Sequence, residues 1–265
     1  MHRWTWQAWQ DKPYLTCDLL ADWAHGFFTQ QFAPAPPEQL VDALAAAAAV
    51  YRTQQVHGNV VLSPTEIEAS LKQPFAENPA AERPSADGSH SDDSDQAVWV
   101  CTADCTPALI GDVRTGQVAA VHAGWRGTAQ KIVPIAIARL QALGSQLKDL
   151  RVALGPAIAG EVYQVNTDVA AEVGESILDA HQFDSPQALV NALMALDQSP
   201  VLPDAEPDKV RLDVRRINAL QLEQLGLAPE QVAIAPHCTY QNPDKFFSYR
   251  RTGQRQVQWS GIVSR

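Results

Sequence analysis

The sequence is poor in three features that would each point to a particular class of protein. Its 265 residues include only four cysteines, and 20 basic residues stand against 30 acidic ones. Four cysteines are too few for the disulfide framework of a small secreted protein. A net charge of −10 would repel a phosphate backbone, so we expect no nucleic acid as a partner. The longest apolar run, from Ala43 to Tyr51, is too short to cross a bilayer, so we expect no membrane partner either.

Targeting signals and common cofactor motifs are missing as well. The segment from Met1 to Trp9 has no apolar stretch behind a basic start, so it does not resemble a signal peptide and we expect a cytoplasmic protein. Neither a G-x-x-x-x-G-K-[ST] loop nor a G-x-G-x-x-G turn occurs, which disfavours nucleotide triphosphate hydrolysis and dinucleotide redox chemistry. The hydrophobic content of 46% is nevertheless ample to bury a core in a chain of this length.

Local patterns in the first hundred residues predict a helix, an interrupted strand and a loop. Residues 38–50 are rich in helix formers and follow two prolines, which predicts a helix. Residues 54–62 predict a β segment that a glycine interrupts, so His57 should lie beside a bend. Residues 73–96 combine prolines with an acidic run and predict a mobile surface loop.

The middle of the chain predicts a β-hairpin followed by a helix. A strand is expected at 97–101, and two further strands at 106–111 and 117–122 should pair around a tight turn. From Thr128 to Gly144 the apolar residues recur at mostly helical spacing, which predicts a helix that Thr128 caps and Pro134 kinks.

The rest of the chain completes an interleaved pattern of strands and helices. The remaining elements are expected at 151–154 (strand), 167–178 (helix), 182–209 (polar loop), 214–225 (helix) and 232–235 (strand). The order follows no strict βαβ rhythm. We therefore expect a single compact domain of mixed α/β class over residues 1–265, with helices packed on a mixed β-sheet.

The predicted hairpin brings candidate metal ligands together. The residue before its first strand and the residue that ends its second emerge at the same end, so Cys105 and His122 should be neighbours, with His57 as a candidate third ligand. A thiolate and two imidazoles suit Zn²⁺ and leave a fourth tetrahedral position for water, whose pKa falls to about 7 on the metal. The same three ligands could hold copper if a methionine supplied a long axial bond. Met1 and Met194, the two methionines of the chain, are far from these segments, so copper is the weaker alternative. The alternative is two ordinary hydrogen-bonded histidines and a buried thiol.

Two further segments suggest contacts with a substrate. Residues 124–127 form a glycine-rich turn into a helix N-terminus, where free N–H groups and Arg126 could bind an anion. Residues 236–240 and 246–251 bring aromatic side chains and two arginines near a strand end, a set suited to stacking a planar ring and holding an oxyanion. The adjacent histidine and cysteine at 237–238 would face opposite ways in a strand, so they cannot form a nucleophile–base pair. The alternatives are a connector without a ligand and an aromatic core with surface arginines.

Several short blocks of sequence carry a family resemblance. They are His25–Thr29 (HGFFT), Gln55–Gly58 (QVHG), Thr102–Pro107 (TADCTP), Val121–Gly127 (VHAGWRG), Leu154–Ile158 (LGPAI), Cys238–Tyr240 (CTY) and Phe246–Arg251 (FFSYRR). Together they resemble the laccase-domain proteins, a family also described as multicopper polyphenol oxidases, purine nucleoside phosphorylases and peptidoglycan editing factors. The resemblance spans about residues 25–251.

The resemblance implies a fold, a metal site and an activity. It implies a compact mixed α/β fold of the cytotoxic necrotizing factor-like, laccase-domain type without separate domains. The family's two histidines and one cysteine match His57, Cys105 and His122 in this sequence. The implied activity is zinc-dependent phosphorolysis of adenosine, inosine and methylthioadenosine to the base and ribose 1-phosphate, with adenosine deamination in addition. The expected partners are therefore a purine nucleoside and phosphate.

Combining the local analysis with the resemblance assigns roles to individual residues. Cys105 would act through the metal, Arg126 and the helix N-terminus would hold phosphate, and Asp104 would orient a ligand or move a proton. The expected substrate-binding residues are Arg126, Cys238, Tyr249 and Arg250. In segment 30–37 the sequence departs from the family, because the usual glycines are missing from what should be one wall of the substrate pocket.

Three other functions compete with nucleoside phosphorolysis. A hydrolase that edits cell-wall precursors could use the same zinc, with a polar pocket around Arg250 and Arg251. Copper-dependent phenol oxidation requires several coppers held mostly by histidines, whereas the seven histidines here are scattered without H-x-H pairs. A non-catalytic, zinc-stabilised binding module would need a fourth protein ligand, for which Cys101 is the one candidate.

Overall fold

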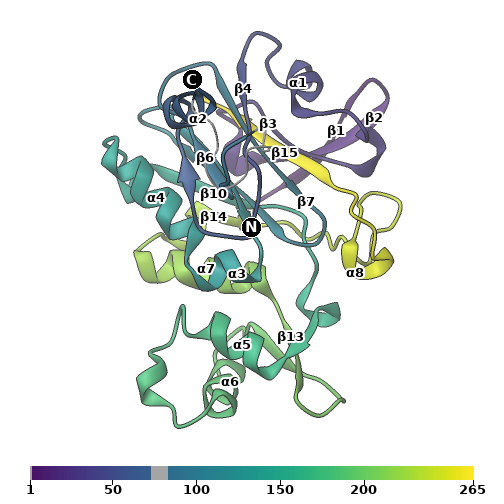
Figure 1. The fold of residues 1–265 in the computed structure, drawn as a ribbon, viewed down its shortest axis with the longest axis vertical. Coiled ribbons are helices and arrows are strands. Elements are labelled where there is room, and N and C mark those ends of the chain that lie inside the picture. Colours follow the sequence, from purple (N-terminus) through teal and green to yellow (C-terminus); the bar gives the residue numbers. More distant parts are fainter. Residues whose placement is uncertain (1, 73–82) are drawn as a thin grey trace.

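Two six-stranded sheets form the centre of the computed structural model, which describes residues 2–72 and 83–265 (Figure 1). The strand order in the first sheet is β1 (Trp4–Trp9), β2 (Lys12–Cys17), β3 (His25–Phe28), β15 (Gln258–Val263), β7 (Gln96–Thr102) and β4 (Ala49–Tyr51). The order in the second is β14 (Val232–Ile234), β10 (Leu150–Leu154), β8 (Thr106–Asp112), β9 (Val118–Ala123), β6 (Gly88–His90) and β5 (Val61–Leu62). Both sheets contain parallel and antiparallel pairs. The mixed α/β class expected from the sequence is confirmed.

A third, smaller sheet and the helices complete the fold. The small sheet has the order β11 (Gln164–Asn166), β13 (Lys209–Leu212) and β12 (Val201–Pro203). The α-helices are α1 (Pro37–Leu40), α2 (Pro64–Leu71), α3 (Trp125–Ala129), α4 (Ile132–Ala142), α5 (Thr167–Gly174), α6 (Pro186–Met194), α7 (Val214–Leu225) and α8 (Tyr249–Thr252). None of the helices in the described residues combines the length and the apolarity needed to cross a membrane.

Alternating side chains on the strands build the layers of the core. Along β9, Val118 and Ala120 belong to the hydrophobic cluster between the two large sheets. Their neighbours Ala119 and Val121 point the other way, into the cluster that α4 and α7 cover. β9 is therefore buried on both faces, and its last residues are held rigidly between two layers.

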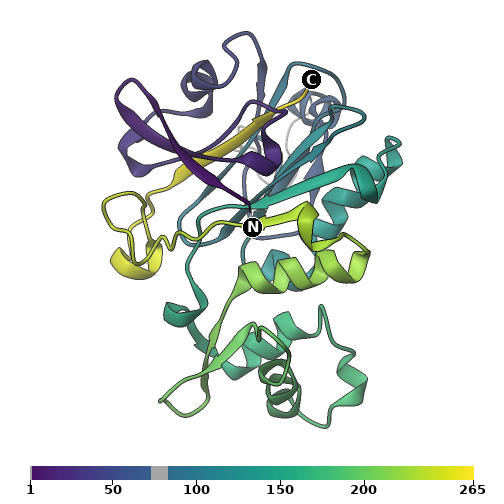
Figure 2. The ribbon, with the colours of Figure 1, turned by 180° about the vertical axis from the view of Figure 1, so that it is seen from behind.

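The small sheet, α5 and α6 share a hydrophobic cluster of their own. Figure 1 shows this part of the chain below α3 and α7, and the reverse view in Figure 2 shows the same arrangement. Trp125 of α3 and Tyr163, just before β11, pack against this cluster as partly buried residues. These two aromatic side chains therefore mark the border between the small unit and the rest of the molecule.

The predicted helix over 38–50 is wrong in most of its length. α1 ends at Leu40, a 3₁₀ turn follows at Val41–Ala43, and β4 begins at Ala49. The alanine-rich run has high helix propensity, but parallel pairing of β4 with β7 overrides it. The predicted strand over 54–62 is reduced to the two residues of β5 and one isolated bridge.

Both predicted loops contain regular structure. Of the loop expected at 73–96, residues 73–82 lie outside the described residues, but β6 and a fully buried Asp87 occupy the later part. The prediction for 182–209 is also wrong, because α6 and β12 lie within that range. Ser185 and Pro186 were a missed signal: the Ser185 hydroxyl accepts the Ala188 N–H, and proline fits the first turn of a helix.

The predictions for the other helices and strands differ in their success. Strands β7, β8, β9, β10 and β14 confirm the predicted strands to within two residues. For α7 the prediction is also confirmed, since the Asp213 carboxylate accepts the Arg216 N–H and Gly226 ends the helix at φ 104°. The helix expected from Thr128 is instead divided into α3 and α4 at Lys131, which has a left-handed φ of 59°.

Candidate metal centre

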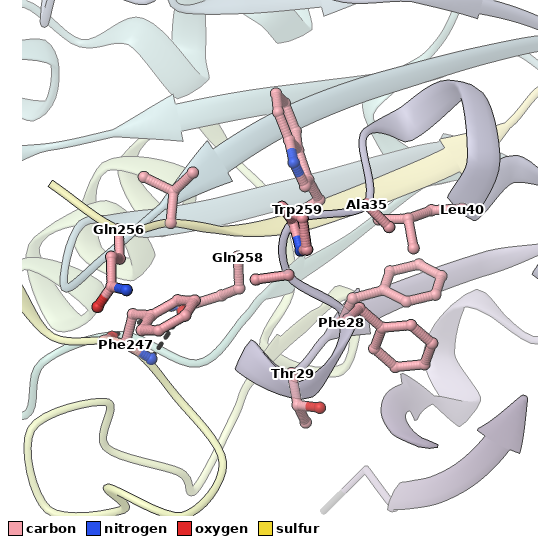
Figure 3. A pocket seen from close by; sticks show the side chains of 12 residues that line it. Phe28, Thr29, Ala35, Leu40, Phe247, Gln256, Gln258 and Trp259 are labelled. Carbon is pink, nitrogen blue, oxygen red and sulfur yellow. Dashed lines mark hydrogen bonds between the residues drawn. The ribbon is translucent and has the colours of Figure 1, made fainter. Parts of the chain in front are cut away.

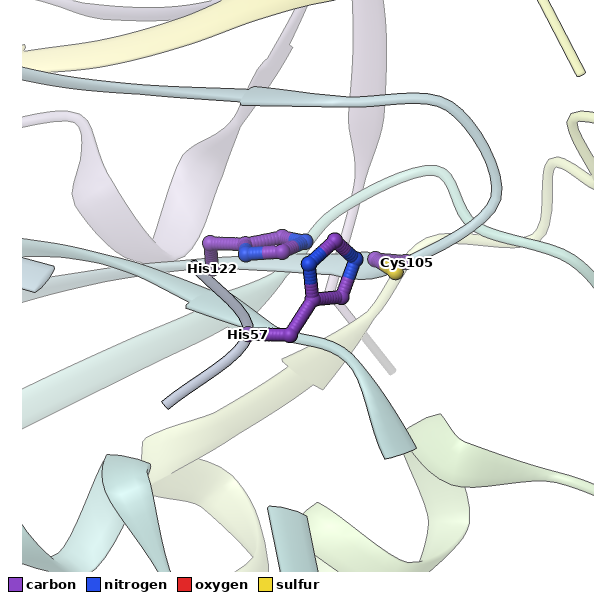
Figure 4. A group of neighbouring side chains, drawn as sticks. All are labelled: His57, Cys105 and His122. Atoms are coloured by element: carbon purple, nitrogen blue, oxygen red, sulfur yellow. The ribbon is translucent and has the colours of Figure 1, made fainter. Parts of the chain in front are cut away.

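The β8–β9 hairpin holds two of the three candidate ligands side by side. Cys105 directly precedes β8, and His122 lies in β9 opposite Pro107. The third ligand, His57, lies in the segment before β5. The ligand atoms of Cys105, His122 and His57 lie within 4.8 Å of one another (Figure 4). The predicted neighbourhood of Cys105 and His122 is confirmed.

Asp87, a residue that no sequence motif pointed to, fixes the position of both histidines. Its carboxylate accepts the backbone N–H groups of Val56, His57 and Gly58 at 3.0, 2.9 and 2.7 Å. These bonds stabilise the unusual left-handed conformation of His57, whose φ is 61°. The same carboxylate accepts Nδ1–H of His122 at 2.7 Å, which leaves Nε2 of that ring free for a metal.

Asp87 was missed because of the sequence distance between it and the residues it holds. It lies 35 residues from His122 and within the range predicted to be a loop. Its burial is complete in the structure. The signal in the sequence was an acidic residue followed by glycine at 87–88.

The electrostatics of the three residues favour a thiolate at Cys105. Burial by itself raises the pKa of the Cys105 thiol. Electrostatic attraction to His122 and hydrogen bonds with His122 and His57 outweigh the effect of burial and lower this pKa to about 6. Burial lowers the pKa of His122, but Cys105 and Asp87 raise it to about 9. For Asp87, burial raises the pKa, whereas hydrogen bonds from His122 and Gly58 bring it below its usual value. A thiolate is the form of cysteine that binds metals, so this site offers it near neutral pH.

The donor set fits a borderline metal ion such as Zn²⁺. Two imidazoles and a thiolate converge, and their accessibility increases from the buried His122 through the half-buried Cys105 to the exposed His57. Cys101, the expected fourth ligand of a structural site, does not belong to the group found among the described residues. Burial raises the pKa of the Cys101 thiol to about 11. Three protein ligands and one exposed side are typical of a catalytic metal site.

Gly124 allows the chain to pass close to this group. A Cβ atom at this position would lie 3.0 Å from Sγ of Cys105 and 3.3 Å from Cδ2 of His57. The backbone of Gly124 is extended, with φ −69° and ψ 169°, so any residue could adopt its conformation. Lack of space beside the ligands, rather than backbone strain, therefore favours glycine here.

Asp104 connects the turn before Cys105 to the C-terminal part of the chain. Its carboxylate accepts the hydroxyl groups of Thr239 at 2.6 Å and Ser248 at 3.0 Å, and the backbone N–H of Arg250 at 2.7 Å. Asp104 is buried and has a φ of 91°. Three donors already occupy the carboxylate, so its geometry suits the positioning of Arg250 better than proton transfer.

The other residues predicted to contact a substrate differ in their exposure and in their hydrogen bonds. Cys238 is buried, and its Sγ accepts the N–H of Ala159, which is a structural arrangement. Tyr249 is 55% exposed. Arg251 donates to the backbone carbonyls of Thr239, Tyr240 and Phe246, so it braces its own segment.

Arg126 and Arg250 are exposed, and each stacks on an aromatic ring. The Arg126 guanidinium lies 4.4 Å from the ring centre of Trp125. That of Arg250 lies 4.7 Å from the ring centre of Tyr163. Both arginines therefore remain as candidates for binding an anion, as the sequence predicted for Arg126.

Comparison with known proteins identifies the family. Residues 36–264 match the family described as "Multi-copper polyphenol oxidoreductase laccase". The chain belongs to this family. The family resemblance and the laccase-domain fold expected from the sequence are thereby confirmed.

The relatives of this chain match it over different lengths. The purine nucleoside phosphorylase of Synechocystis sp. is 56% identical over 261 residues, which cover 98% of this chain and 97% of the relative. A purine nucleoside phosphorylase of Bacteroides thetaiotaomicron is 34% identical over 169 residues, or 62% of this chain and 55% of the relative. The crystal structure of YlmD from Geobacillus stearothermophilus superposes with a TM-score of 0.78 at 25% identity, covering 98% of each chain.

The family description names several coppers, whereas the described residues offer one candidate metal centre. Within residues 2–72 and 83–265, His57, Cys105 and His122 form the one group of three or more potential ligands. Other histidines have different surroundings. Nε2 of His25 accepts the N–H of Cys17 at 2.9 Å, and His237 packs on the ring of Trp6.

A cavity of about 290 Å³ lies on the outer side of the first sheet (Figure 3). Its walls come from segment 28–35, Leu40, Phe247 and the strand segment 256–259. None of the predicted site residues lines it. The glycine-free segment 30–37, expected to form a wall of the substrate pocket, therefore borders this separate cavity.

Proposed function

We propose that this protein is a zinc-dependent purine nucleoside phosphorylase that also deaminates adenosine. Phosphorolysis would convert adenosine, inosine or methylthioadenosine and phosphate into the free base and ribose 1-phosphate. Deamination would convert adenosine and water into inosine and ammonia. The observation that carries the proposal is the convergence of His57, Cys105 and His122, in a chain 56% identical over nearly its full length to a protein named as a purine nucleoside phosphorylase.

His57, Cys105 and His122 would hold the metal, and Asp87 would keep both histidines in place. Zn²⁺ at this position would supply a Lewis acid and lower the pKa of bound water, which is the chemistry that deamination requires. The exposed side of the group, at His57, is the side from which a small substrate would approach.

The arginines would serve the phosphorolysis reaction. In this reaction the bond between the base and C1′ of the ribose breaks, and a phosphate oxygen forms the new bond to C1′. Phosphate is negatively charged, so it needs donors that hold it beside the sugar. Arg126 and Arg250 are exposed, and Asp104 positions the backbone of Arg250. Arginine suits this task because its planar group donates two parallel hydrogen bonds to phosphate.

The other candidate functions receive less support. Editing of cell-wall precursors was linked to a pocket around Arg250 and Arg251, but Arg251 donates to three backbone carbonyls of its own segment. Copper-dependent oxidation requires several metal ions, whereas the described residues bring together one group of three ligands.

A turnover assay with purified, metal-quantified protein tests the proposal. Adenosine, inosine and methylthioadenosine are each supplied with and without phosphate, and free base is separated from deaminated nucleoside by chromatography. We expect base release that requires phosphate, ammonia release that does not, and loss of both on chelation with recovery on zinc addition. A protein with stoichiometric zinc that turns over none of the nucleosides would refute the proposal and favour the amide-editing hydrolase.

A further inference from the structure

Tyr163 follows a segment that is hydrogen-bonded to the turn before Cys105, and no sequence motif pointed to it. The segment that leads to it is tied to the turn before Cys105, because the N–H of Ile158 donates to the carbonyl of Asp104 at 2.9 Å. The ring of Tyr163 supports the Arg250 guanidinium, and Nη1 of Arg250 donates to the carbonyl of Gln164 at 2.7 Å. Tyr163 and Arg250 therefore form one unit at the border of the small sheet.

Four charged groups of the site act electrostatically on the phenol of Tyr163. Cys105, Asp104, Arg250 and Arg126 are all close enough for their charges to act on it. Burial is the main cause that raises the pKa of Tyr163 to about 12, so the phenol is a neutral donor at physiological pH. Arg126 stacks on Trp125 and Arg250 on Tyr163, and both aromatic rings pack against the same hydrophobic cluster, so the two arginines reach one border of the small unit from different parts of the chain.

Donors in this group remain unused within the described part of the chain. The Tyr163 hydroxyl makes no hydrogen bond there, and the Arg126 side chain forms neither a hydrogen bond nor an ion pair. Arg250 uses one side-chain N–H, toward Gln164. A neutral hydroxyl and two guanidinium groups suit a ligand with several anionic oxygens.

We propose that Tyr163, Arg250 and Arg126 form the phosphate subsite of this protein, with the phenol and both guanidinium groups donating to the phosphate oxygens. The role of this subsite in catalysis rests on the proposed phosphorylase function, whereas its ability to bind phosphate does not. The stacked ring of Tyr163 also restricts Arg250 to few orientations, so less entropy is lost when phosphate binds.

Direct phosphate binding tests this inference separately from turnover. Inorganic phosphate is titrated into the full-length, metal-quantified protein by isothermal calorimetry, and the KM values for phosphate and inosine are measured in parallel. Tyr163→Phe removes only the hydroxyl and keeps the ring under Arg250. Tyr14→Phe is the matched control, because Tyr14 also lies against another side chain, the ring of Phe28 at 5.1 Å, but in a different part of the molecule.

We expect Tyr163→Phe to weaken phosphate binding at least about tenfold, as the loss of a hydrogen bond to a charged ligand should, with unchanged zinc content and inosine KM. Arg250→Lys should raise the phosphate KM as well, and Tyr14→Phe should behave as the parent protein. Phosphate binding that depends on Tyr163 in a protein without turnover would support the subsite and refute the phosphorylase. Phosphate-dependent turnover with an unchanged phosphate Kd in Tyr163→Phe would overturn the subsite alone. No phosphate binding by the parent protein would overturn it too.

Discussion

The metal centre and the cavity over the first sheet show two different uses of buried space. At the metal centre, Asp87 and Asp104 are buried carboxylates whose hydrogen bonds come from distant segments of the chain. Around the cavity, the largest side chains are aromatic, and Gln258 exchanges hydrogen bonds with the backbone of Phe247, another lining residue. A cavity lined by aromatic side chains would by itself suggest a ligand site, whereas converging donor atoms point to the metal centre.

Substitutions in the two regions should therefore differ in their effect on metal binding. Polar groups at the metal centre are coupled, because each carboxylate orients several other groups and an unpaired buried charge is costly. Aromatic contacts around the cavity contribute mainly to folding stability. The following predictions test this separation, in order of their expected effect on metal affinity.

Loss of the thiolate should have the largest effect. We expect Cys105→Ala to abolish stoichiometric zinc binding and to lower nucleoside turnover by more than about 100-fold. Metal analysis of the dialysed protein and the chromatographic assay measure both. Cys17→Ala is the control, because Cys17 is a buried thiol between the two large sheets. Full activity of Cys105→Ala would refute the assignment of this site.

Loss of the Asp87 charge should have the next largest effect. Asp87→Asn keeps the size of the side chain but weakens its bonds to His122 and to three backbone amides, so we expect zinc affinity to fall about 10- to 100-fold. Competition with a chromogenic chelator measures this. Asp112→Asn is the matched control: Asp112 is equally buried and accepts two backbone N–H groups far from the metal. Equal effects in both variants would mean that Asp87 acts through stability alone.

Crowding beside the ligands should have a smaller effect. In Gly124→Ala the new methyl group would press on Cys105 and His57, and we expect zinc affinity to fall about tenfold, within the usual range for overpacking. Gly58→Ala is the comparison, because a Cβ there meets its neighbours only at 3.7 Å. The same chelator competition is used. An unchanged affinity in Gly124→Ala would show that the ligands can move aside freely.

A change at the cavity should leave the metal in place. Phe28 is buried against the rings of Tyr14, Phe32 and Trp99, so Phe28→Ala should lower the free energy of unfolding by about 3–5 kcal/mol. Denaturant titration measures the loss, and zinc affinity of the folded protein should not change. Weaker zinc binding in this variant would show that the two regions are coupled.

The predictions from sequence succeeded where neighbours along the chain decide the structure. The β8–β9 hairpin joins Cys105 to His122 through a short turn, and α7 carries its own start at Asp213 and its own stop at Gly226. They failed where a distant partner decides. The alanine-rich run is followed by a strand at Ala49–Tyr51 because β7 lies beside it, and the late part of the predicted loop at 73–96 is buried because β6 pairs with β9.

Residue chemistry and short-range periodicity are sufficient to predict the ligand types, the hairpin that joins two of them and the mixed class of the fold. Other contacts arise only on folding: Asp87 holds His57 and His122, Asp104 holds the Arg250 backbone, and Tyr163 lies under the Arg250 side chain. These contacts join residues 30 to 146 positions apart. Such pairs form only when packing of the core brings their segments together. Once buried, a polar group loses its contact with water and must bond to the partner that the fold places beside it.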